Sequence, residues 1–411
     1  MESLLKLSLD SANEETIEES WEMISDKEVE DIKQSLQNET LDSGAQKIKE
    51  FLEKLDKTVL NIAVTGMSGK GKSTFVNAIR GLGDEDEGSA PTGVVETTMK
   101  ATPYHHQKYP NVTLWDLPGI GTENFRADEY LEKVEFHRYD FFIIISSERF
   151  TSYDADLAKE IQNMGKMCYF VRSKIDESLR AEARKKTFNE KATLNKIQQN
   201  CITGLQDLSI ESPKVFLISS FELEKYDFPQ LQETLEKDLP QQKRHVFLLA
   251  LPNITQNINL KKKEVLQADI WRMALLSATA AAVPVPGLGF AADLTILVKE
   301  ISKYYKAFGL DEASLKNLSE RVNVPVEELK KAMKYKYNEN ITTNMIIKML
   351  TKVAGGGLQL TGYFLSTIPI IGSLPAGGIA FGTTYRMLHS CLDELAENAH
   401  LVLLRAFSSP V

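Results

Sequence analysis

The chain has 411 residues, 43% hydrophobic and 26% charged, an ordinary globular composition that excludes a fibrous or disordered protein. Its length predicts roughly two or three domains, and its three cysteines are too few for a disulfide framework or a zinc ribbon. The net charge of −9 comes from residues 1–57, which hold 16 acidic and 7 basic residues. No domain-wide basic surface indicates a nucleic-acid partner, and none is expected.

The N-terminal segment, residues 1–57, is predicted to be a helical lead-in. Ser25-Asp26-Lys27-Glu28 has the spacing of a capping box, and the apolar residues of 45–55 recur at helical spacing. The start of the sequence lacks a signal-peptide pattern, and Glu2 stands where N-myristoylation requires glycine. We therefore expect a cytoplasmic protein without an N-terminal lipid anchor.

Short apolar runs begin at Val59 and alternate with amphipathic stretches of ten or more residues. This alternation favours an α/β fold, a mostly parallel sheet with flanking helices. After about Pro240 the strand pattern stops and the sequence indicates helices. The expected division is a helical segment over 1–57, an α/β domain over 58–240 and a helical region over 241–411. The predicted strands are Val59–Val64, Val112–Trp115, Phe141–Ile145, Cys168–Val171 and Val215–Ile218.

A phosphate-binding loop follows the first predicted strand. Residues Gly66–Ser73 match the P-loop pattern, whose glycines let backbone amides point at phosphate oxygens. The helix that follows adds its positive dipole end. Lys72 is expected to contact the β- and γ-phosphates, and the Ser73 hydroxyl to bind Mg²⁺. The residues expected to bind phosphate are Gly66, Met67, Ser68, Gly69, Lys70, Gly71, Lys72, Ser73 and Thr74.

A second motif, Asp116-Leu117-Pro118-Gly119, ends another predicted strand. Asp116 is expected to hold Mg²⁺ through water, and the Gly119 amide to sense the γ-phosphate. Between the P-loop and Asp116, a switch loop should close over the metal, and one of its threonines should be a ligand. Spacing does not decide between Thr92, Thr97 and Thr98, and we take Thr98 as the candidate.

A third motif selects guanine over adenine. Ser173-Lys174-Ile175-Asp176 has the spacing of a guanine-reading motif, in which Lys174 lies along the base. The Asp176 carboxylate can accept hydrogen bonds from N1–H and N2–H₂ of guanine, donors that adenine lacks. Ser173 replaces the usual Asn or Thr. Ser219 and Ser220, after the last predicted strand, are expected to present backbone amides to the guanine O6. The expected ligands are therefore GTP or GDP with Mg²⁺.

The residue after Gly119 is Ile120, where simple molecular-switch GTPases have a Gln that orients the attacking water. Isoleucine can neither donate nor accept a hydrogen bond. Hydrolysis in an isolated monomer should therefore be slow unless another group reaches the site. Glu96, in the switch loop, is the candidate to orient water or to bridge to a partner.

Taken together, these motifs resemble the immunity-related GTPases, also called interferon-inducible GTPases of the p47 type. The resemblance covers roughly residues 45–320. It rests on the runs Leu60–Gly66, Phe75–Gly81, Thr92–Thr98, Trp115–Gly119, Tyr139–Ile144 and Tyr169–Arg172. Three further runs, Tyr226–Pro229, Lys243–His245 and Phe308–Asp311, extend it beyond the GTPase motifs.

The resemblance implies a dynamin-like GTPase in which the N- and C-terminal segments form one all-helical domain. It also implies homo-oligomers that form head to head through the GTPase domain, with hydrolysis activated in trans. Family members act on endomembranes or pathogen-containing vacuoles in innate immunity and also pair with one another. Lys72 places the chain with the effector-like branch, whose P-loop lysine is intact.

Two uncharged stretches, 273–292 and 353–385, lie in the helical region. The prolines of the second divide it into arms too short to span a bilayer, so an interfacial or re-entrant hairpin is one interpretation. Lys330, Lys331, Lys334 and Lys336 lie upstream and can meet anionic head groups. The other interpretation is that both stretches are core helices packed closely through Gly and Ala.

The sequence therefore predicts a GTP-hydrolysing, self-assembling protein associated peripherally with endomembranes or vacuoles. Two alternatives remain. One is a regulatory module that binds GTP with negligible turnover. The other is a structural membrane-binding protein outside host defence.

Overall fold

The computed structural model describes residues 46–47, 49–50, 53–54, 57–93, 98, 100–120, 126–281, 288–337, 341–353 and 375–407. Several predictions fall outside these residues: the capping box Ser25–Glu28, the switch residues Glu96 and Thr97, and most of the second uncharged stretch. The chain divides into two compact units, one of which runs over Lys57–Thr255. The other contains the helices from Gln256 onward.

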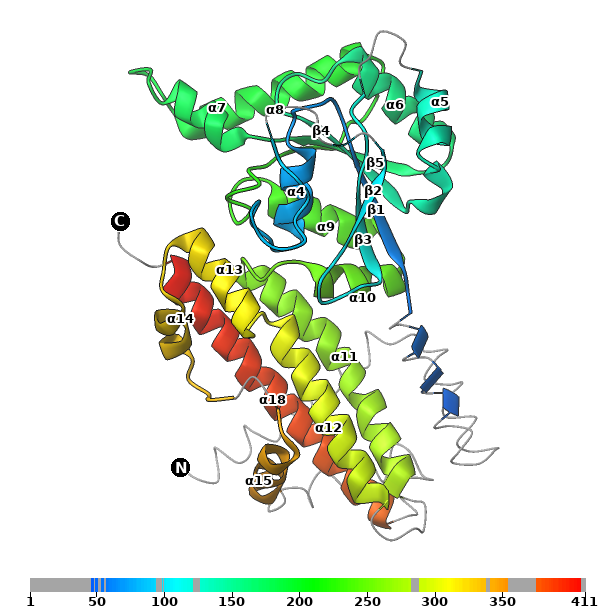
Figure 1. Cartoon of the computed structure of the whole chain (residues 1–411), viewed down its shortest axis with the longest axis vertical. Coiled ribbons are helices and arrows are strands. Elements are labelled where there is room, and N and C mark those ends of the chain that lie inside the picture. The colour runs from blue at the N-terminus through cyan, green and yellow to red at the C-terminus, as the bar shows by residue number, and fades with distance from the viewer. Residues whose placement is uncertain are drawn as a thin grey trace. The chain divides into compact units, whose positions relative to one another are not determined.

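The Lys57–Thr255 unit is built on a six-stranded sheet in the order β2-β3-β1-β4-β5-β6 (Figure 1). All neighbouring strands are parallel except β2 and β3, which pair antiparallel. The mostly parallel sheet predicted from the apolar runs is confirmed. Its strands are β1 (Leu60–Thr65), β2 (Thr102–His105), β3 (Val112–Asp116), β4 (Phe141–Ser146), β5 (Met167–Arg172) and β6 (Val215–Leu217).

Helices cover both faces of this sheet, as the continuous apolar strands require. They are α4 (Lys72–Ile79), α5 (Ala127–Lys133), η1 (Phe136–Arg138), α6 (Ser152–Asn163), α7 (Ile175–Glu182), α8 (Glu190–Asp207), α9 (Phe228–Asp238) and α10 (Gln241–Ala250). Successive strand residues point to opposite faces. Ala63, Phe142 and Phe170 belong to a core cluster with α5, α6 and α8. Ile62 and Ile143 face α4, α9 and α10 instead.

The C-terminal limit of this unit falls after Thr255, whereas the sequence placed it after residue 240. The difference comes from α10. Phe247 on this helix and Leu251 just after it lie against Phe75 of α4 and Ile62 of β1, so α10 completes the hydrophobic layer on one face of the sheet. A helix pattern alone does not tell which core a helix joins.

Every element of regular secondary structure that the structure describes in the second unit is a helix. Its three long helices, α11, α12 and α18, pack side by side (Figure 1). Buried residues such as Ile270, Ile301 and Leu392 form the core between them. The helices are α11 (Gln256–Ala281), α12 (Leu288–Ala307), α13 (Glu312–Val322), α14 (Val326–Ala332), α15 (Thr343–Val353) and α18 (Pro375–Phe407).

The uncharged stretches lie partly on these helices. In the first stretch, Met273, Ala274, Leu275, Ser277 and Ala278 are buried, so this part of α11 is a core helix. The second stretch is described only at its ends. Within the described part of the chain, no helix is both long enough and apolar enough to span a bilayer.

Candidate nucleotide site

The P-loop between β1 and α4 depends on glycine at two positions. Gly66 has φ 136°, and a Cβ built there would lie 2.1 Å from the carbonyl oxygen of Ile145, so no other residue fits. Gly71 precedes α4 with φ 93°, in the left-handed region. The chain therefore leaves β1, curls closely past β4 and enters α4 at Lys72 in the way that a phosphate-binding loop requires.

One pocket lies over this loop. Of the predicted phosphate-binding residues, Gly66, Met67 and Lys70 do not line it. The Lys72 side chain is nearly buried, and its Nζ donates to the carbonyl oxygen of Met67 at 3.1 Å, across the loop. An ammonium held there is placed to meet a phosphate anion. The lining residues are Ser68, Gly69, Gly71, Lys72, Ser73, Thr74, Thr92, Gly93, Thr98 and Lys174.

Three predicted metal-binding side chains converge below the pocket. Ser73 Oγ donates to Asp116 Oδ2 at 2.6 Å, and Thr98 Oγ1 donates to the same oxygen at 2.9 Å. Asp116 is 1% exposed, and its Oδ1 has no hydrogen-bond partner within the described residues. Burial raises the pKa of this carboxyl, although the Ser73 and Thr98 hydrogen bonds and the charge of Lys72 act in the opposite direction.

These residues fit a magnesium ion. Two hydroxyl oxygens and a carboxylate are the hard oxygen ligands that Mg²⁺ prefers. Asp116 Oδ1 is a buried acceptor, which a water molecule on the ion can satisfy. Of the three candidate threonines, Thr98 contacts Asp116 and Thr92 lines the pocket, while Thr97 lies outside the described residues. The geometry therefore favours Thr98 over Thr92.

Ile120 faces away from the pocket. Its side chain is 4% exposed and belongs to the core cluster under α5 and α6. Its backbone N–H donates to the Gly66 carbonyl at 3.3 Å, which fixes the residue beside the P-loop. Among the described residues that line the pocket, none carries a carboxylate or a carboxamide that could orient water. Glu96, the candidate for that role, lies outside the described residues.

Tyr130 of α5 supports the segment before Gly119, a contact that the sequence did not predict. Its hydroxyl donates to the Pro118 carbonyl at 2.9 Å and lies 2.9 Å from Thr65 Oγ1. A tyrosine hydroxyl has one hydrogen, so the Thr65 hydroxyl is the donor in the second bond. Burial raises the pKa of Tyr130, which keeps this hydrogen in place. The bonds join the end of β1 to the segment that should carry the γ-phosphate sensor.

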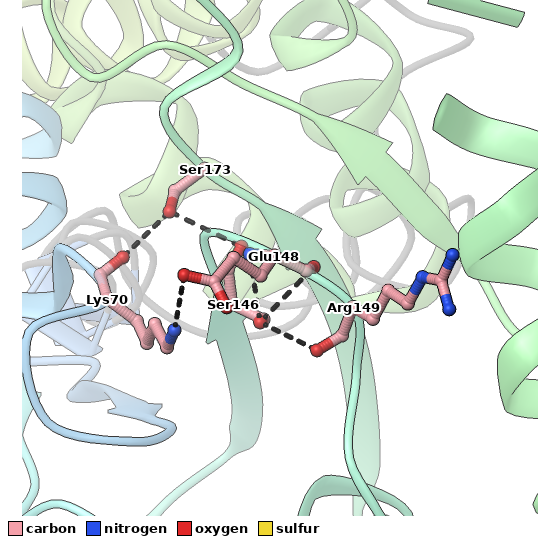
Figure 2. A network of polar contacts seen from close by, with 5 residues as sticks. All are labelled: Lys70, Ser146, Glu148, Arg149 and Ser173. Carbon is pink, nitrogen blue, oxygen red and sulfur yellow. Dashed lines mark hydrogen bonds and ion pairs between the residues drawn. The ribbon is translucent and has the colours of Figure 1, made fainter. Parts of the chain in front are cut away.

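The predicted guanine motif is tied to the P-loop through Ser173. Ser173 is 2% exposed, and its hydroxyl donates a hydrogen bond to the Lys70 carbonyl at 2.7 Å (Figure 2). Lys174 follows with φ 56° and lines the pocket, and Asp176 lies in the first turn of α7. Asp176 is not among the lining residues. Ser173 thus keeps the link to the P-loop despite its departure from the usual Asn or Thr.

Ser219 and Ser220 follow β6, the strand beside β5, so they lie at the same edge of the sheet as Asp176. Ser219 is fully buried, and its Oγ accepts from the Glu222 N–H at 3.3 Å. The Ile175 N–H donates to the carbonyl of Ile218 at 3.4 Å, which joins the two loops. Neither serine lines the pocket.

Lys70 also makes an ion pair that the motifs do not predict. Its Nζ lies 3.2 Å from a carboxylate oxygen of Glu148, which is in the loop after β4 (Figure 2). Ser146 and the Glu148 and Arg149 carbonyls form hydrogen bonds within that loop. Lys70 therefore contacts both neighbouring loops, through its carbonyl with Ser173 and through its side chain with the exposed Glu148.

Comparison with known proteins identifies relatives of the whole chain. The family model described as interferon-inducible GTPase (IIGP) matches residues 25–405. Interferon-inducible GTPase 5 of Bos taurus is 40% identical over 391 residues, which are 95% of this chain and 84% of the relative. Interferon-inducible GTPase 1 of Mus musculus is 43% identical over 289 residues, 70% of each chain.

Among solved structures, the chain is similar to a member of an oligomerised bacterial dynamin pair. The identity is 15%, and the match covers 93% of this chain and 76% of the other. The TM-score is 0.33, a value at which the likeness supports no argument about function.

Proposed function

Because the chain belongs to the interferon-inducible GTPase family, we propose that it binds GTP with Mg²⁺ at the Gly66–Ser73 loop, hydrolyses it and self-assembles in the GTP state. The family is of the immunity-related type, and the chain is a GTPase of that family. The observation that carries the proposed site is the convergence of Ser73 and Thr98 on the buried Asp116 carboxylate beneath the pocket.

Each side chain of the proposed site has a role that follows from its position. Lys72 and the loop amides bind the β- and γ-phosphates and neutralise charge that develops as the bond to the γ-phosphate breaks. Ser73, Thr98 and Asp116 would hold Mg²⁺, which supplies charge stabilisation to the phosphate oxygens. Lys174 lies beside the P-loop, where it can flank the base, and Asp176 would accept from the two guanine donors.

The described pocket lining has no carboxylate or carboxamide to orient the attacking water, so we infer that such a group comes from elsewhere. Ile120 is buried in the core, and the lining offers only hydroxyl, amine and backbone groups. A group from a second copy, or Glu96 positioned when a second copy binds, would complete the site. This requirement supports homo-oligomers that form through the GTPase unit and activate hydrolysis in trans.

Sedimentation velocity of the full chain tests assembly. With a non-hydrolysable GTP analogue and Mg²⁺, the wild type should sediment as a dimer or larger species, and with GDP as a monomer. Lys72→Ala, which loses the phosphate contact, should remain monomeric with both. A wild type that stays monomeric with the analogue, at concentrations where it binds, would contradict self-assembly.

The membrane proposal now concerns the second uncharged stretch, since the described part of the first is a core helix. Two of the upstream lysines already have partners: Lys330 pairs with Glu312 and Lys334 with Glu397. Exposed ion pairs of this kind contribute little, so they can yield to anionic lipid. The same proposal includes action on endomembranes in innate immunity. Measuring expression with and without interferon tests the role in host defence.

Liposome flotation tests membrane binding. The Phe364→Asp, Ile371→Asp double variant should lose flotation with anionic liposomes while it still binds GTP. Both positions lie outside the described residues. Flotation equal to the wild type would reject insertion of this stretch.

A further inference from the structure

A second hollow lies in the GTPase unit, outside the nucleotide pocket. Its volume is about 1060 Å³, which is at the upper end of pockets that bind small molecules. It lies at the carboxyl ends of β4 and β5, between the loop after β4 and helices α7 and α8. This edge of a parallel sheet is where α/β folds bind ligands. Its lining includes Cys201 and five charged residues, Glu148, Arg149, Arg172, Glu182 and Lys196.

Arg172, the last residue of β5, lines this hollow with a guanidinium that is only partly satisfied. Its Nη1 is buried and makes no hydrogen bond within the described residues. Burial lowers the pKa of Arg172, while the nearby Cys201 and Glu148 act in the opposite direction. A buried guanidinium nitrogen that has lost water and gained no acceptor costs free energy, so an anionic group that reached Nη1 from the hollow would remove that cost.

The acidic residues of the lining are already engaged elsewhere. Glu148 pairs with Lys70 of the P-loop at 3.2 Å, as Figure 2 shows, and Glu182 pairs with Lys185 at 2.7 Å. Neither lysine is among the lining residues.

Three cations remain in the lining. Arg149, Arg172 and Lys196 all line the hollow, and in Figure 2 the Arg149 side chain points away from Lys70. These three cations face two carboxylates, Glu148 and Glu182, each of which also pairs with a lysine outside the lining, so the hollow presents an excess of positive charge. Ser178 and Thr193 add hydroxyl donors to the wall. An anion is the ligand that such a lining recognises.

We propose that this hollow binds a small molecule bearing a phosphate or carboxylate group, anchored by the Arg172 guanidinium. The site is separate from the guanine-nucleotide pocket, with which it shares no lining residue.

Thermal unfolding of the full chain, saturated with Mg²⁺ and GDP so that the nucleotide pocket is filled, tests the proposal. The probes are inorganic phosphate and succinate, titrated at constant ionic strength against chloride. At ten times its Kd, a bound probe should raise Tm by about 3–5 °C. Arg172→Gln should abolish the rise, and the control Arg180→Gln, an exposed arginine of α7 outside the lining, should keep it.

GDP binding shows whether Arg172→Gln folds. If it does not fold, protection of lysines from acetylation in the wild-type protein tests the proposal instead. The probe should slow acetylation of Lys196, measured by mass spectrometry, and leave that of Lys191, an exposed neighbour on α8, unchanged. The proposal is overturned by any of three results: no Tm rise with either probe, the same rise in folded Arg172→Gln, or a rise without protection of Lys196. Phosphate binding without succinate binding would assign the ligand to the phosphate class.

Discussion

The Ser173 hydroxyl donates a hydrogen bond to the main-chain carbonyl of Lys70 at 2.7 Å. This contact joins the predicted guanine motif to the P-loop across 103 residues of sequence. The two loops that should hold opposite ends of the nucleotide are thereby fixed relative to each other, and the guanine motif is placed by the loop that binds phosphate.

Ser173→Ala should weaken binding of GTP and GDP about tenfold. The substitution leaves the Lys70 carbonyl without its donor, a loss of about 1–3 kcal/mol, and loosens the link between the loops. Preference for GTP over ATP should persist because Asp176 is unchanged. Ser173→Thr keeps the hydroxyl and is the matched control. Fluorescent-nucleotide titration measures both variants, and wild-type affinity in Ser173→Ala would show that the bond does not support the site.

Asp176→Asn should lose affinity for GTP by about 100-fold and gain affinity for xanthosine triphosphate. The carboxylate accepts two donors from guanine, and an asparagine replaces one acceptor with a donor that suits the xanthine carbonyl. Glu177→Gln, the next residue along α7, is the control and should bind GTP normally. Unchanged GTP affinity in Asp176→Asn would remove Asp176 from the site.

Asp116→Asn should change how stability depends on pH and on metal. Burial raises the pKa of Asp116 in the folded protein, so its contribution to stability is present below the unfolded pKa of about 3.9 and is lost as pH rises through the folded value. In EDTA without nucleotide, the free energy of unfolding of the wild type minus that of Asp116→Asn should therefore fall as pH rises from 4 to 7.

With GDP present at pH 7, Mg²⁺ should stabilise the wild type and leave Asp116→Asn almost unaffected. Urea unfolding measures both effects. A difference between the two proteins that rises with pH would contradict the raised pKa of Asp116, and equal stabilisation by Mg²⁺ would contradict its metal role.

Ile120→Gln should not create a faster enzyme. The Ile120 side chain lies in the core cluster, so the glutamine would bury an amide without a partner and cost about 2–4 kcal/mol of stability. Turnover per folded molecule should not increase. Ile120→Val, which keeps the apolar contact, should cost about 0.5–1.5 kcal/mol. A marked rise in monomer turnover in Ile120→Gln would mean that this position does reach the attacking water.

Local motifs made much of the fold and site predictable. Strands β1, β3, β4, β5 and β6 are continuous apolar runs because helices cover both faces of the sheet. Strand β2 was not predicted, since its four residues alternate in burial and include Pro103, which is tolerated at the sheet edge. Strand β2 forms because it pairs with β3, and its own sequence does not indicate a strand.

Contacts that depend on tertiary arrangement were not predictable. Tyr130 reaches Pro118 only because α5 packs over the end of β1, and Glu148 reaches Lys70 only because β4 lies beside β1 in the sheet. Neither contact has a signature in residue spacing. By contrast, Asp116 ends β3 and Ser73 lies just after the loop that follows the adjacent strand β1, so their convergence at the carboxyl edge of the sheet follows from the topology.

The most direct test of the account is GTP turnover per molecule across a hundredfold range of protein concentration, with ATP as the control nucleotide. The buried Ile120, and the lack of a carboxylate among the described residues of the pocket lining, predict turnover that climbs with concentration, because a second copy completes the site. ATP should not be hydrolysed. A flat and appreciable rate would mean that a single chain holds a complete catalytic site, and a flat rate near zero would favour a GTP-binding regulatory module.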